Sequence, residues 1–236
     1  MVNSNYKTAI VLHLYYQDLW PEFKEKILPI LSDDTHLYVS INERNEYTED
    51  IEKYSKEVFL VENRGMDFGP FVFIYNKIQS LNYKYIVKLH GKKSLHSPGL
   101  GDYWRTTLVN SIINSADHFY HIINFMENDS DIFMASSSEF YYDTDRESIN
   151  HPNRLAALSF INKVRKFANS GEHGCFFAGS MFIVTTNYLE KLFANVDLIE
   201  LYEQFELGYS MDSFAHGMER VIGYGVIKNN GKYLTI

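Results

Sequence analysis

The sequence lacks several features that would by themselves define a class of protein. Its 236 residues include one cysteine, Cys175, so no disulfide can form within the chain and a reducing, cytoplasmic environment is expected. No apolar run approaches the roughly 20 residues that cross a bilayer, and no charged leader with an apolar core opens the chain. We therefore expect a protein that does not span a membrane but that can associate with the inner face of the cell membrane.

Excess positive charge is also missing. The formal net charge is −8 and no stripe of lysine and arginine is visible, which makes a nucleic acid an unexpected partner. Apolar residues, in contrast, are abundant: they form 45% of the chain, and 18 Tyr and 17 Phe are present. This composition predicts a well-packed globular domain over residues 1–236, either a whole protein or one domain of a larger synthase. It leaves the oligomeric state open.

Common signatures of nucleotide, metal and hydrolase sites are absent as well. The chain contains neither GxGxxG nor GxxxxGK[ST]. It has no HExxH motif and no Cys/His cluster with zinc spacing. No GxSxG elbow supports Ser-His-Asp hydrolysis, and the lack of a carboxylate-rich metal cluster disfavours a phosphate-ester hydrolase.

Apolar runs and amphipathic segments alternate along the chain. The apolar runs predict strands over residues 8–16, 35–42, 57–63, 83–90, 131–137 and 175–185. The amphipathic segments predict helices over 21–31, 49–56, 70–81, 102–127, 153–168, 187–196 and 211–225. Asp102 is expected to cap the start of the fourth helix, and Gly225 is expected to end the last one. This alternation is typical of an α/β fold with a single Rossmann-like, mostly parallel sheet and helices on both faces.

Polar residues gather where the predicted strands end. In parallel sheets ligands bind beyond the carboxyl ends of the strands, so the loops after residues 15, 42, 62, 89 and 136 should share one edge. The candidates there are His13, Tyr15, Asn63, Arg64, Gly65, Asp67, His90, Lys92 and Lys93. Lysine is suited to phosphate oxygens, and the glycines allow a tight turn that points Arg64 and Asp67 toward a ligand. The start of the helix at Pro70 is expected to offer amides to an anion. Ordinary solvated loops are the alternative.

Two later segments add candidates. Gly179 lies inside an apolar run, which predicts close approach by a ligand or by another backbone. In MDSFAHGMER, Asp212 and His216 share a helix face with either Glu219 or Arg220. A solvated helix face is the alternative for this second segment.

Six blocks together resemble one family. They are HLYYQDLWPE, VENRGMDFGPF, YIVKLHGKKS, GDYWR, FFAGSMF and DSFAHGMERVIG, and in this order they resemble the rhamnan synthesis protein F family from about residue 8 to residue 225. The resemblance implies a GT-A-like glycosyltransferase that builds cell-surface polysaccharides such as O-antigens. It implies a UDP- or dTDP-linked donor of rhamnose or galactofuranose type and a lipid-linked or oligosaccharide acceptor.

The resemblance also implies roles for particular residues. Asp212, then Asp67, are the candidate general bases of an inverting transfer. Donor binding is expected at His13, Tyr15, Asn63, Arg64, Gly65, His90, Lys92, Lys93, Gly179 and Arg220, and a sugar or acceptor pocket at Trp104, Arg105 and Glu219. Where GT-A enzymes usually have a metal-binding Asp-x-Asp, this chain reads His90-Gly91-Lys92, so we expect a metal-independent enzyme without a cofactor. The alternative is a non-catalytic module that binds nucleotide-sugar or glycan in a polysaccharide assembly complex.

Overall fold

A mixed sheet of seven strands forms the centre of the molecule in the computed structural model, which describes residues 7–91, 93, 98–143, 175–209 and 213–236. The strands, in the order β3-β2-β1-β4-β8-β5-β9, are β3 (Glu57–Leu60), β2 (Thr35–Ile41), β1 (Thr8–Leu14), β4 (Tyr85–His90), β8 (Phe182–Thr185), β5 (Ile132–Ser136) and β9 (Lys232–Thr235). Only β8 runs antiparallel to its neighbours. The predicted mostly parallel sheet is confirmed.

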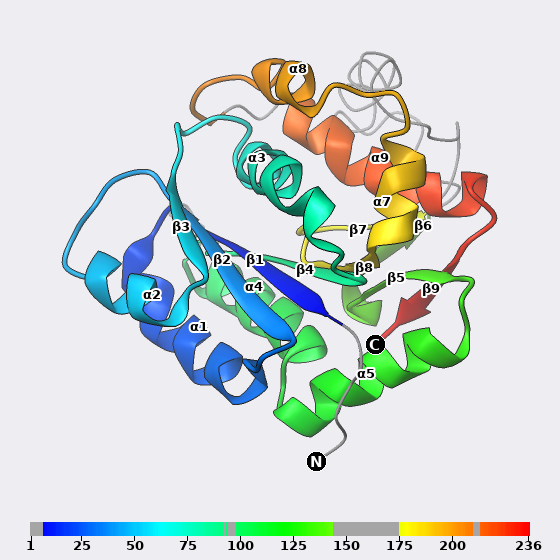
Figure 1. The fold of residues 1–236 in the computed structure, drawn as a ribbon, viewed down its shortest axis with the longest axis horizontal. Helices are drawn as coiled ribbons and strands as arrows, with labels where there is room; N and C mark the ends of the chain where they lie inside the picture. The colour runs from blue at the N-terminus through cyan, green and yellow to red at the C-terminus, as the bar shows by residue number, and fades with distance from the viewer. Residues whose placement is uncertain (1–6, 92, 94–97, 144–174, 210–212) are drawn as a thin grey trace.

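Helices cover both faces of this sheet, as predicted (Figure 1). One face carries α1 (Trp20–Ile27), α2 (Thr48–Tyr54), α4 (Pro98–Ile112) and α5 (Ala116–Asn128). The other carries α3 (Phe68–Ile78), α7 (Thr186–Leu192), α8 (Leu198–Glu203) and α9 (Phe214–Lys228). The alternation of side chains along a strand divides the core accordingly: Ile10 and Leu12 of β1 pack beneath α1, while Ala9 and Val11 pack beneath α3.

Short elements connect or extend the larger ones. They are the 3₁₀ turns η1 (Gln17–Leu19), η2 (Leu28–Ile30), η3 (Gln79–Leu81) and η4 (Ser138–Phe140), and the antiparallel pair β6 (Tyr141–Asp143) and β7 (Cys175–Phe177). The helix predicted over 153–168 lies outside the described residues. Within the described ranges, no helix combines the length and the hydrophobicity needed to cross a bilayer.

The long helix predicted over 102–127 is wrong in one respect, because two helices occupy this region. The first begins at Pro98, so Asp102 lies inside α4 and pairs with Arg105 instead of capping the helix. The second begins after Ser115, whose hydroxyl accepts a hydrogen bond from the amide of His118 at 3.1 Å. This side-chain cap satisfies an amide that a continuous helix would have bonded to its own backbone, so the chain can restart there.

The single strand predicted over 175–185 is also wrong. Gly179 and Ser180 have φ angles of 91° and 55°, and two consecutive left-handed residues cannot continue an extended strand. The segment therefore divides into β7, which pairs with β6, and β8, which enters the main sheet.

The carboxyl-terminal region differs from the prediction as well. The last helix passes through Gly225 and ends at Lys228. A Cβ at Gly225 would lie 2.5 Å from the hydroxyl oxygen of Tyr188, so this glycine allows α9 to pack on α7 and does not end the helix. The edge strand β9 and the helix α8 were not predicted.

Candidate functional site

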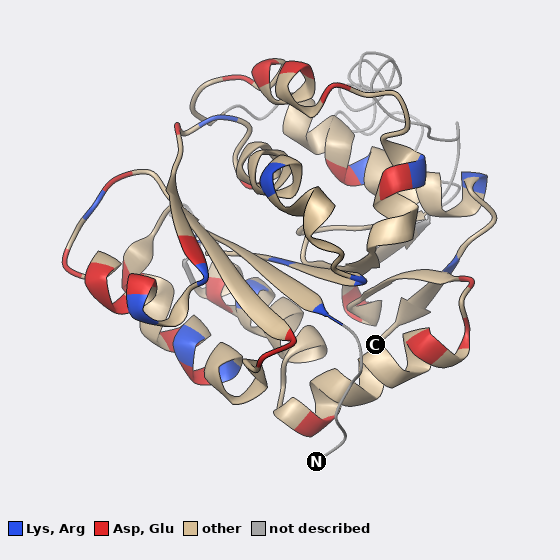
Figure 2. Ribbon diagram, viewed as in Figure 1, with Lys and Arg blue, Asp and Glu red and all other residues tan. Residues whose placement is uncertain are grey.

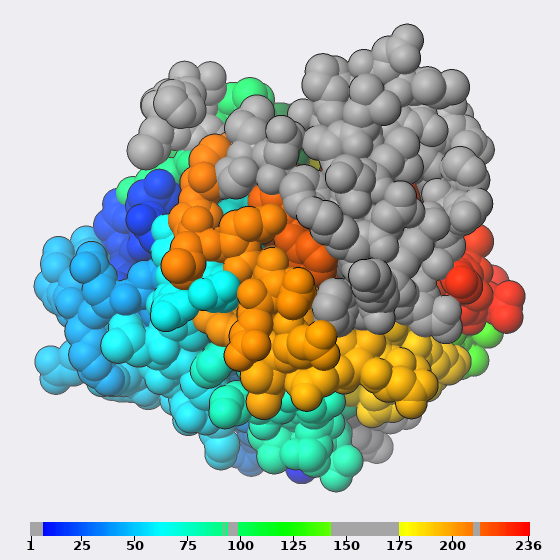
Figure 3. All heavy atoms as spheres, turned by 90° about the horizontal axis from the view of Figure 1, so that it is seen from above, coloured from blue at the N-terminus to red at the C-terminus, as the bar shows by residue number. Residues whose placement is uncertain are grey.

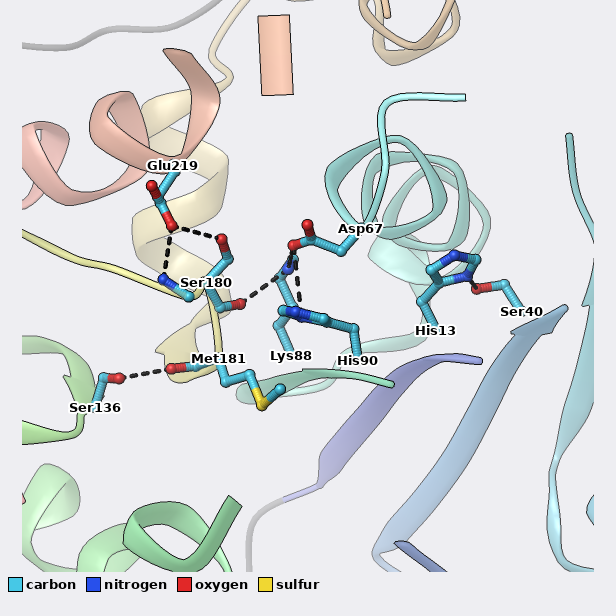
Figure 4. A network of polar contacts seen from close by, with 10 residues as sticks. His13, Ser40, Asp67, Lys88, His90, Ser136, Ser180, Met181 and Glu219 are labelled. Atoms are coloured by element: carbon cyan, nitrogen blue, oxygen red, sulfur yellow. Dashed lines mark hydrogen bonds and ion pairs between the residues drawn. The ribbon is translucent and has the colours of Figure 1, made fainter. Parts of the chain in front are cut away.

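Three polar side chains form a row across the carboxyl-terminal ends of the parallel strands. Ser40 of β2 and His90 of β4 are both in register with His13 of β1, so all three leave the same face of the sheet. This is the face that α3 covers, because Val11 lies on it. The three residues are 0 to 8% exposed, and His13 Nδ1 lies 3.0 Å from Ser40 Oγ (Figure 4).

Burial decides the protonation state of His13. Desolvation lowers its pKa from 6.5 to about 4, an effect that the charge of Asp67 opposes and that of Lys88 reinforces. The imidazole is therefore neutral at pH 7 and has one nitrogen that donates and one that accepts. At the His13 position, the row therefore contains an uncharged group that can form hydrogen bonds.

The loop between β3 and α3 brings Asp67 onto this row. Gly65 has a φ of 65°, and a Cβ there would lie 2.5 Å from the Phe205 ring, so the turn requires glycine. It places Asp67 directly before α3, where Oδ2 lies 3.6 Å from His90 Nδ1 and forms an ion pair with Lys88 Nζ (Figure 4). The sequence correctly predicted that these loops converge at one edge.

The neighbours of Asp67 determine its charge. Burial alone would favour the neutral acid, but Lys88 and His90 outweigh it and hold the pKa of Asp67 well below its usual range. Burial lowers the pKa of Lys88, and the Asp67 carboxylate opposes that shift. The result is an ionised, weakly basic carboxylate facing an imidazole.

Lys88 is the member of this cluster that the motifs did not identify. Its side chain is 1% exposed, and its Nζ lies 4.4 Å from the centroid of the Phe68 ring. The sequence signal that could have identified Lys88 is its position two residues before His90. Residues two apart in a strand point to the same face of the sheet. A lysine at an inward position of the apolar strand YIVKLH is a signal of the same kind as the KKS sequence that follows it.

The turn between β7 and β8 forms the other side of the cluster. The carbonyl of Ser180 accepts a hydrogen bond from Lys88 Nζ at 2.9 Å. Glu219 of α9 accepts hydrogen bonds from the Gly179 amide at 2.8 Å and from the Ser180 hydroxyl at 3.0 Å. A Cβ at Gly179 would lie 2.5 Å from Leu108 Cδ1, so side chains of α4, and not another backbone, pack against this glycine. The predicted approach of a ligand at Gly179 stays a prediction.

Arg64 faces the chain that follows α8. Its Nη1 donates to the carbonyl of Phe205 at 2.7 Å, and its Nε lies 3.3 Å from Glu62 Oε2. Asn63 joins the same contact, because its carbonyl accepts from the Gly208 amide at 2.7 Å. The orange segment after α8 accordingly lies against the cyan loop in Figure 3. In this structure both residues connect two loops, and their role in donor binding remains a prediction.

The expectation that the start of α3 offers free amides to an anion is wrong. The amides of Phe68 and Gly69 both donate to the carbonyl of Gly65, at 3.0 and 3.1 Å. Pro70 has no amide hydrogen, and the Phe71 amide donates to the Asp67 carbonyl at 3.3 Å. The tight turn at Gly65 satisfies these donors locally, so the helix start contributes no vacant hydrogen bond.

Two residues predicted for donor binding lie near the first loop. Lys93 forms an ion pair with Asp18, and its Nζ lies 5.1 Å from the centroid of the Tyr16 ring. Tyr15 is 45% exposed and packs edge-on against Tyr16. Lys93 and Tyr15 therefore lie beside the loop that follows β1, the middle strand of the row.

The residues predicted for the sugar or acceptor pocket have structural contacts. Trp104 stacks on Phe140 with centroids 5.1 Å apart. The guanidinium of Arg105 lies 2.9 Å from Glu22 and joins α4 to α1. Both residues belong to α4, on the face of the sheet opposite α3. Trp104 also borders the Gly179–Ser180 turn, because a Cβ at Gly179 would lie 2.8 Å from its Nε1.

Arg220 lies beside the Gly179–Ser180 turn and not on the row. Its guanidinium lies over the Phe176 ring at 4.5 Å, and its Nη1 is 3.4 Å from Glu219 Oε2. Asp212 and Lys92 lie outside the described residues, so their predicted roles stay predictions.

The donor set at the row does not fit a divalent cation. Hard cations prefer several carboxylate or carbonyl oxygens, whereas the carboxylate nearest the row, Asp67, is already paired with an ammonium group. Across the described part of the chain, no three His, Cys, Asp or Glu side chains are arranged to hold a metal ion. Basic and acidic residues are interspersed along the helices, and the described residues show no continuous basic stripe (Figure 2).

The fold and this cluster define an α/β protein with a charged, buried site at the carboxyl ends of its parallel strands. The sequence matches the family described as rhamnan synthesis protein F over residues 1–231, and the chain belongs to that family. It is also 26% identical over 239 residues to the uncharacterised protein WxcX from two strains of Xanthomonas campestris pv. campestris. The match covers 97% of this chain but 32% of WxcX, so the chain spans about a third of the length of these relatives.

A solved structure also shows distant similarity. Core-mannan synthase A (CmsA/Ktr4) from Aspergillus fumigatus, in its Mn/GDP form, is 10% identical and aligns with a TM-score of 0.42 over 97% of this chain and 73% of that one. This score is too low to support a statement about fold or function.

Proposed function

We propose that this chain is a glycosyltransferase that moves a sugar of rhamnose or galactofuranose type from a nucleotide-linked donor to a growing cell-surface polysaccharide. Family membership supports the assignment. The observation that carries it is the Asp67–Lys88–His90 cluster, which lies where parallel α/β sheets bind nucleotides. The proposed donor is UDP- or dTDP-linked, the acceptor is lipid-linked or an oligosaccharide, and the protein acts at the inner face of the cell membrane.

The basic side chains at this edge are proposed to neutralise the leaving diphosphate. Negative charge grows on that group as the glycosidic bond breaks, and fixed positive charge nearby lowers the barrier. His90 belongs to the row, Lys93 lies beside it, and Lys92 lies between these two residues in sequence. Because Lys93 is paired with Asp18, the diphosphate would replace that exposed carboxylate. Neutral His13 then hydrogen-bonds the nucleoside or ribose.

Asp212 is the proposed general base of an inverting transfer. A general base works best when its pKa lies near the working pH, and the ion pair with Lys88 holds the pKa of Asp67 far below that. This argues against Asp67 as the base and in favour of Asp212, which directly precedes the Ser213 cap of α9. Asp67 is then assigned to orienting His90.

Sugar transfer without a metal is the direct test of this function. Purified protein would be incubated with UDP- and dTDP-linked rhamnose or galactofuranose and a lipid-linked oligosaccharide, with and without EDTA. We expect transfer at equal rates in both conditions. A strict need for added Mn²⁺ or Mg²⁺ would refute metal independence, and donor binding without any transfer would identify a non-catalytic module instead.

The identity of the general base can be tested with one substitution and a control substitution that changes the net charge by the same amount. Asp212→Asn should reduce turnover by roughly 10²-fold or more and leave donor affinity near wild type. Asp33→Asn removes an exposed carboxylate before β2, at the opposite end of the strands, and should change neither quantity. Near-normal turnover in Asp212→Asn would return the role to Asp67.

A further inference from the structure

Lys88 carries a charge where an apolar side chain would fill the same space. It is 1% exposed and packs against the ring of Phe68. Burying an ammonium group is unfavourable unless the group is well paired, and methionine at this position would avoid that desolvation. We therefore explain the presence of lysine at this position by the hydrogen bonds and the ion pair that its ammonium group forms.

The ammonium group connects two loops that are distant in sequence. It forms the ion pair with Asp67 in the β3–α3 loop, and it donates to the carbonyl oxygen of Ser180 at 2.9 Å (Figure 4). Both loops lie at the same edge, because Lys88 pairs with Phe182 near the start of β8. One side chain thus fixes the separation between the Asp67 loop and the Ser180 turn.

The Ser180 turn depends on contacts from two sides. Ser180 adopts a left-handed conformation, which is strained in a residue other than glycine. Glu219 holds the amide of Gly179 and the hydroxyl of Ser180, while Lys88 holds the Ser180 carbonyl. Loss of Lys88 would leave a buried carbonyl without its ammonium partner and free the turn to relax.

We propose that Lys88 is a positioning residue of the donor site, holding the Asp67 carboxylate beside His90 and the Gly179–Ser180 turn in place without contacting the donor. This inference rests on the proposed glycosyltransferase function. A displacement of about 1 Å at a reacting group can cost 10²-fold in rate. Lys88 would therefore govern turnover more strongly than donor binding.

Lys88→Met tests this role, with Lys84→Met as its control. Lys84 lies just before the same strand and pairs with Glu127 at 2.6 Å, but it is 45% exposed and lies at the opposite end. Transfer and UDP or dTDP affinity would be measured per folded molecule, with the folded fraction taken from urea unfolding. We expect turnover to fall about 10²-fold in Lys88→Met, nucleotide affinity to stay close to wild type, and Lys84→Met to match wild type in both.

Lys88→Gln provides a second variant in case the methionine variant does not fold. Its neutral amide has two N–H donors that can bond to Asp67 or Ser180, so we expect the fold to be retained while the ionic contact is lost. The acid limb of its pH–rate profile should move to higher pH, because Asp67, which also faces His90, loses the cation that keeps its pKa low.

Two results would overturn the proposal, and they differ from failure of the proposed function. Turnover that only follows the folded fraction, with an unmoved pH profile, assigns Lys88 a purely structural role while wild-type transfer still supports the enzyme. Wild-type protein that transfers no sugar from any of the donors contradicts the glycosyltransferase itself, and the positioning role with it.

Discussion

Buried polar networks lie at both ends of the parallel strands, and they differ in charge. At the amino-terminal end, the Tyr83 hydroxyl lies 2.6 Å from His36 Nδ1 and 2.8 Å from the Tyr38 hydroxyl. Burial, with the bond to Tyr38, raises the pKa of Tyr83, so its hydroxyl stays protonated. At the carboxyl-terminal end, an ammonium and a carboxylate are buried together.

We attribute this difference to a structural role at the amino-terminal end and to the proposed function at the carboxyl-terminal end. Hydroxyl–imidazole bonds close one end of the sheet at modest cost, since no ionised carboxylate or ammonium group in that trio has to be desolvated. A buried ion pair is expensive and is often no better for stability than apolar packing. Its presence at the end where α/β sheets bind ligands favours a role in ligand chemistry.

The largest expected difference between the two ends concerns their ion pairs. Asp67→Asn leaves the Lys88 ammonium buried without a carboxylate and should reduce the free energy of unfolding by about 3–5 kcal/mol. Asp129→Asn removes the exposed pair with Lys232 at the other end and should cost less than about 1 kcal/mol. Urea unfolding at pH 7 measures both. Equal losses would remove the distinction between the two ends.

The dependence of the free energy of unfolding on pH should reveal the lowered pKa of His13. Its folded pKa of about 4 lies below its unfolded value of 6.5, so the unfolded chain binds more protons between these values. The stabilisation that this residue provides is complete above pH 6.5 and is lost as the pH falls toward 4, by about 3 kcal/mol. His13→Asn should flatten that decline in urea midpoints. An unchanged slope would mean that His13 titrates normally.

The strained turn at the site edge is expected to tolerate no side chain. Gly179→Ala adds a Cβ 2.5 Å from Leu108 Cδ1 and 2.8 Å from Trp104 Nε1 at a φ of 91°, and should cost about 1–3 kcal/mol. Gly99→Ala in α4 has nothing within 4 Å of the new atom and should change stability by less than about 1 kcal/mol. Thermal unfolding compares them, and a stable Gly179→Ala would show that the turn is not constrained.

The smallest effect is expected at the amino-terminal network. Tyr83→Phe removes the hydroxyl that bonds to His36 and Tyr38, and should cost about 1 kcal/mol. Sugar transfer per folded molecule should equal that of wild type. A substantial loss of transfer in this variant would show that the two ends are coupled in function.

The fold could largely be predicted because strand and helix periodicities are local properties. The strands β1 to β5 and the convergence of their loops follow from those patterns. The break at Gly179–Ser180 and the edge strand β9 could not be predicted, since they depend on Lys88, Glu219 and β5, which are remote in sequence.

The candidate site could be predicted only in part, because some of its contacts join residues that are remote in sequence. Asp67, His90 and His13 follow from the rule that polar residues at strand ends converge. Lys88 was missed because its partners, the Asp67 carboxylate and the Ser180 carbonyl, are 21 and 92 residues away. Arg64 faces Phe205 because the chain after α8 folds back over its loop, which local pattern does not indicate.

A structure of the protein with UDP or dTDP bound tests the central claim most directly. We predict that the diphosphate lies within hydrogen-bonding reach of His90 and of residues 91–93, at the end of the sheet where the Asp67–Lys88 pair lies. A diphosphate bound at the Tyr83 end, or on the face covered by α1 and α5, would contradict it.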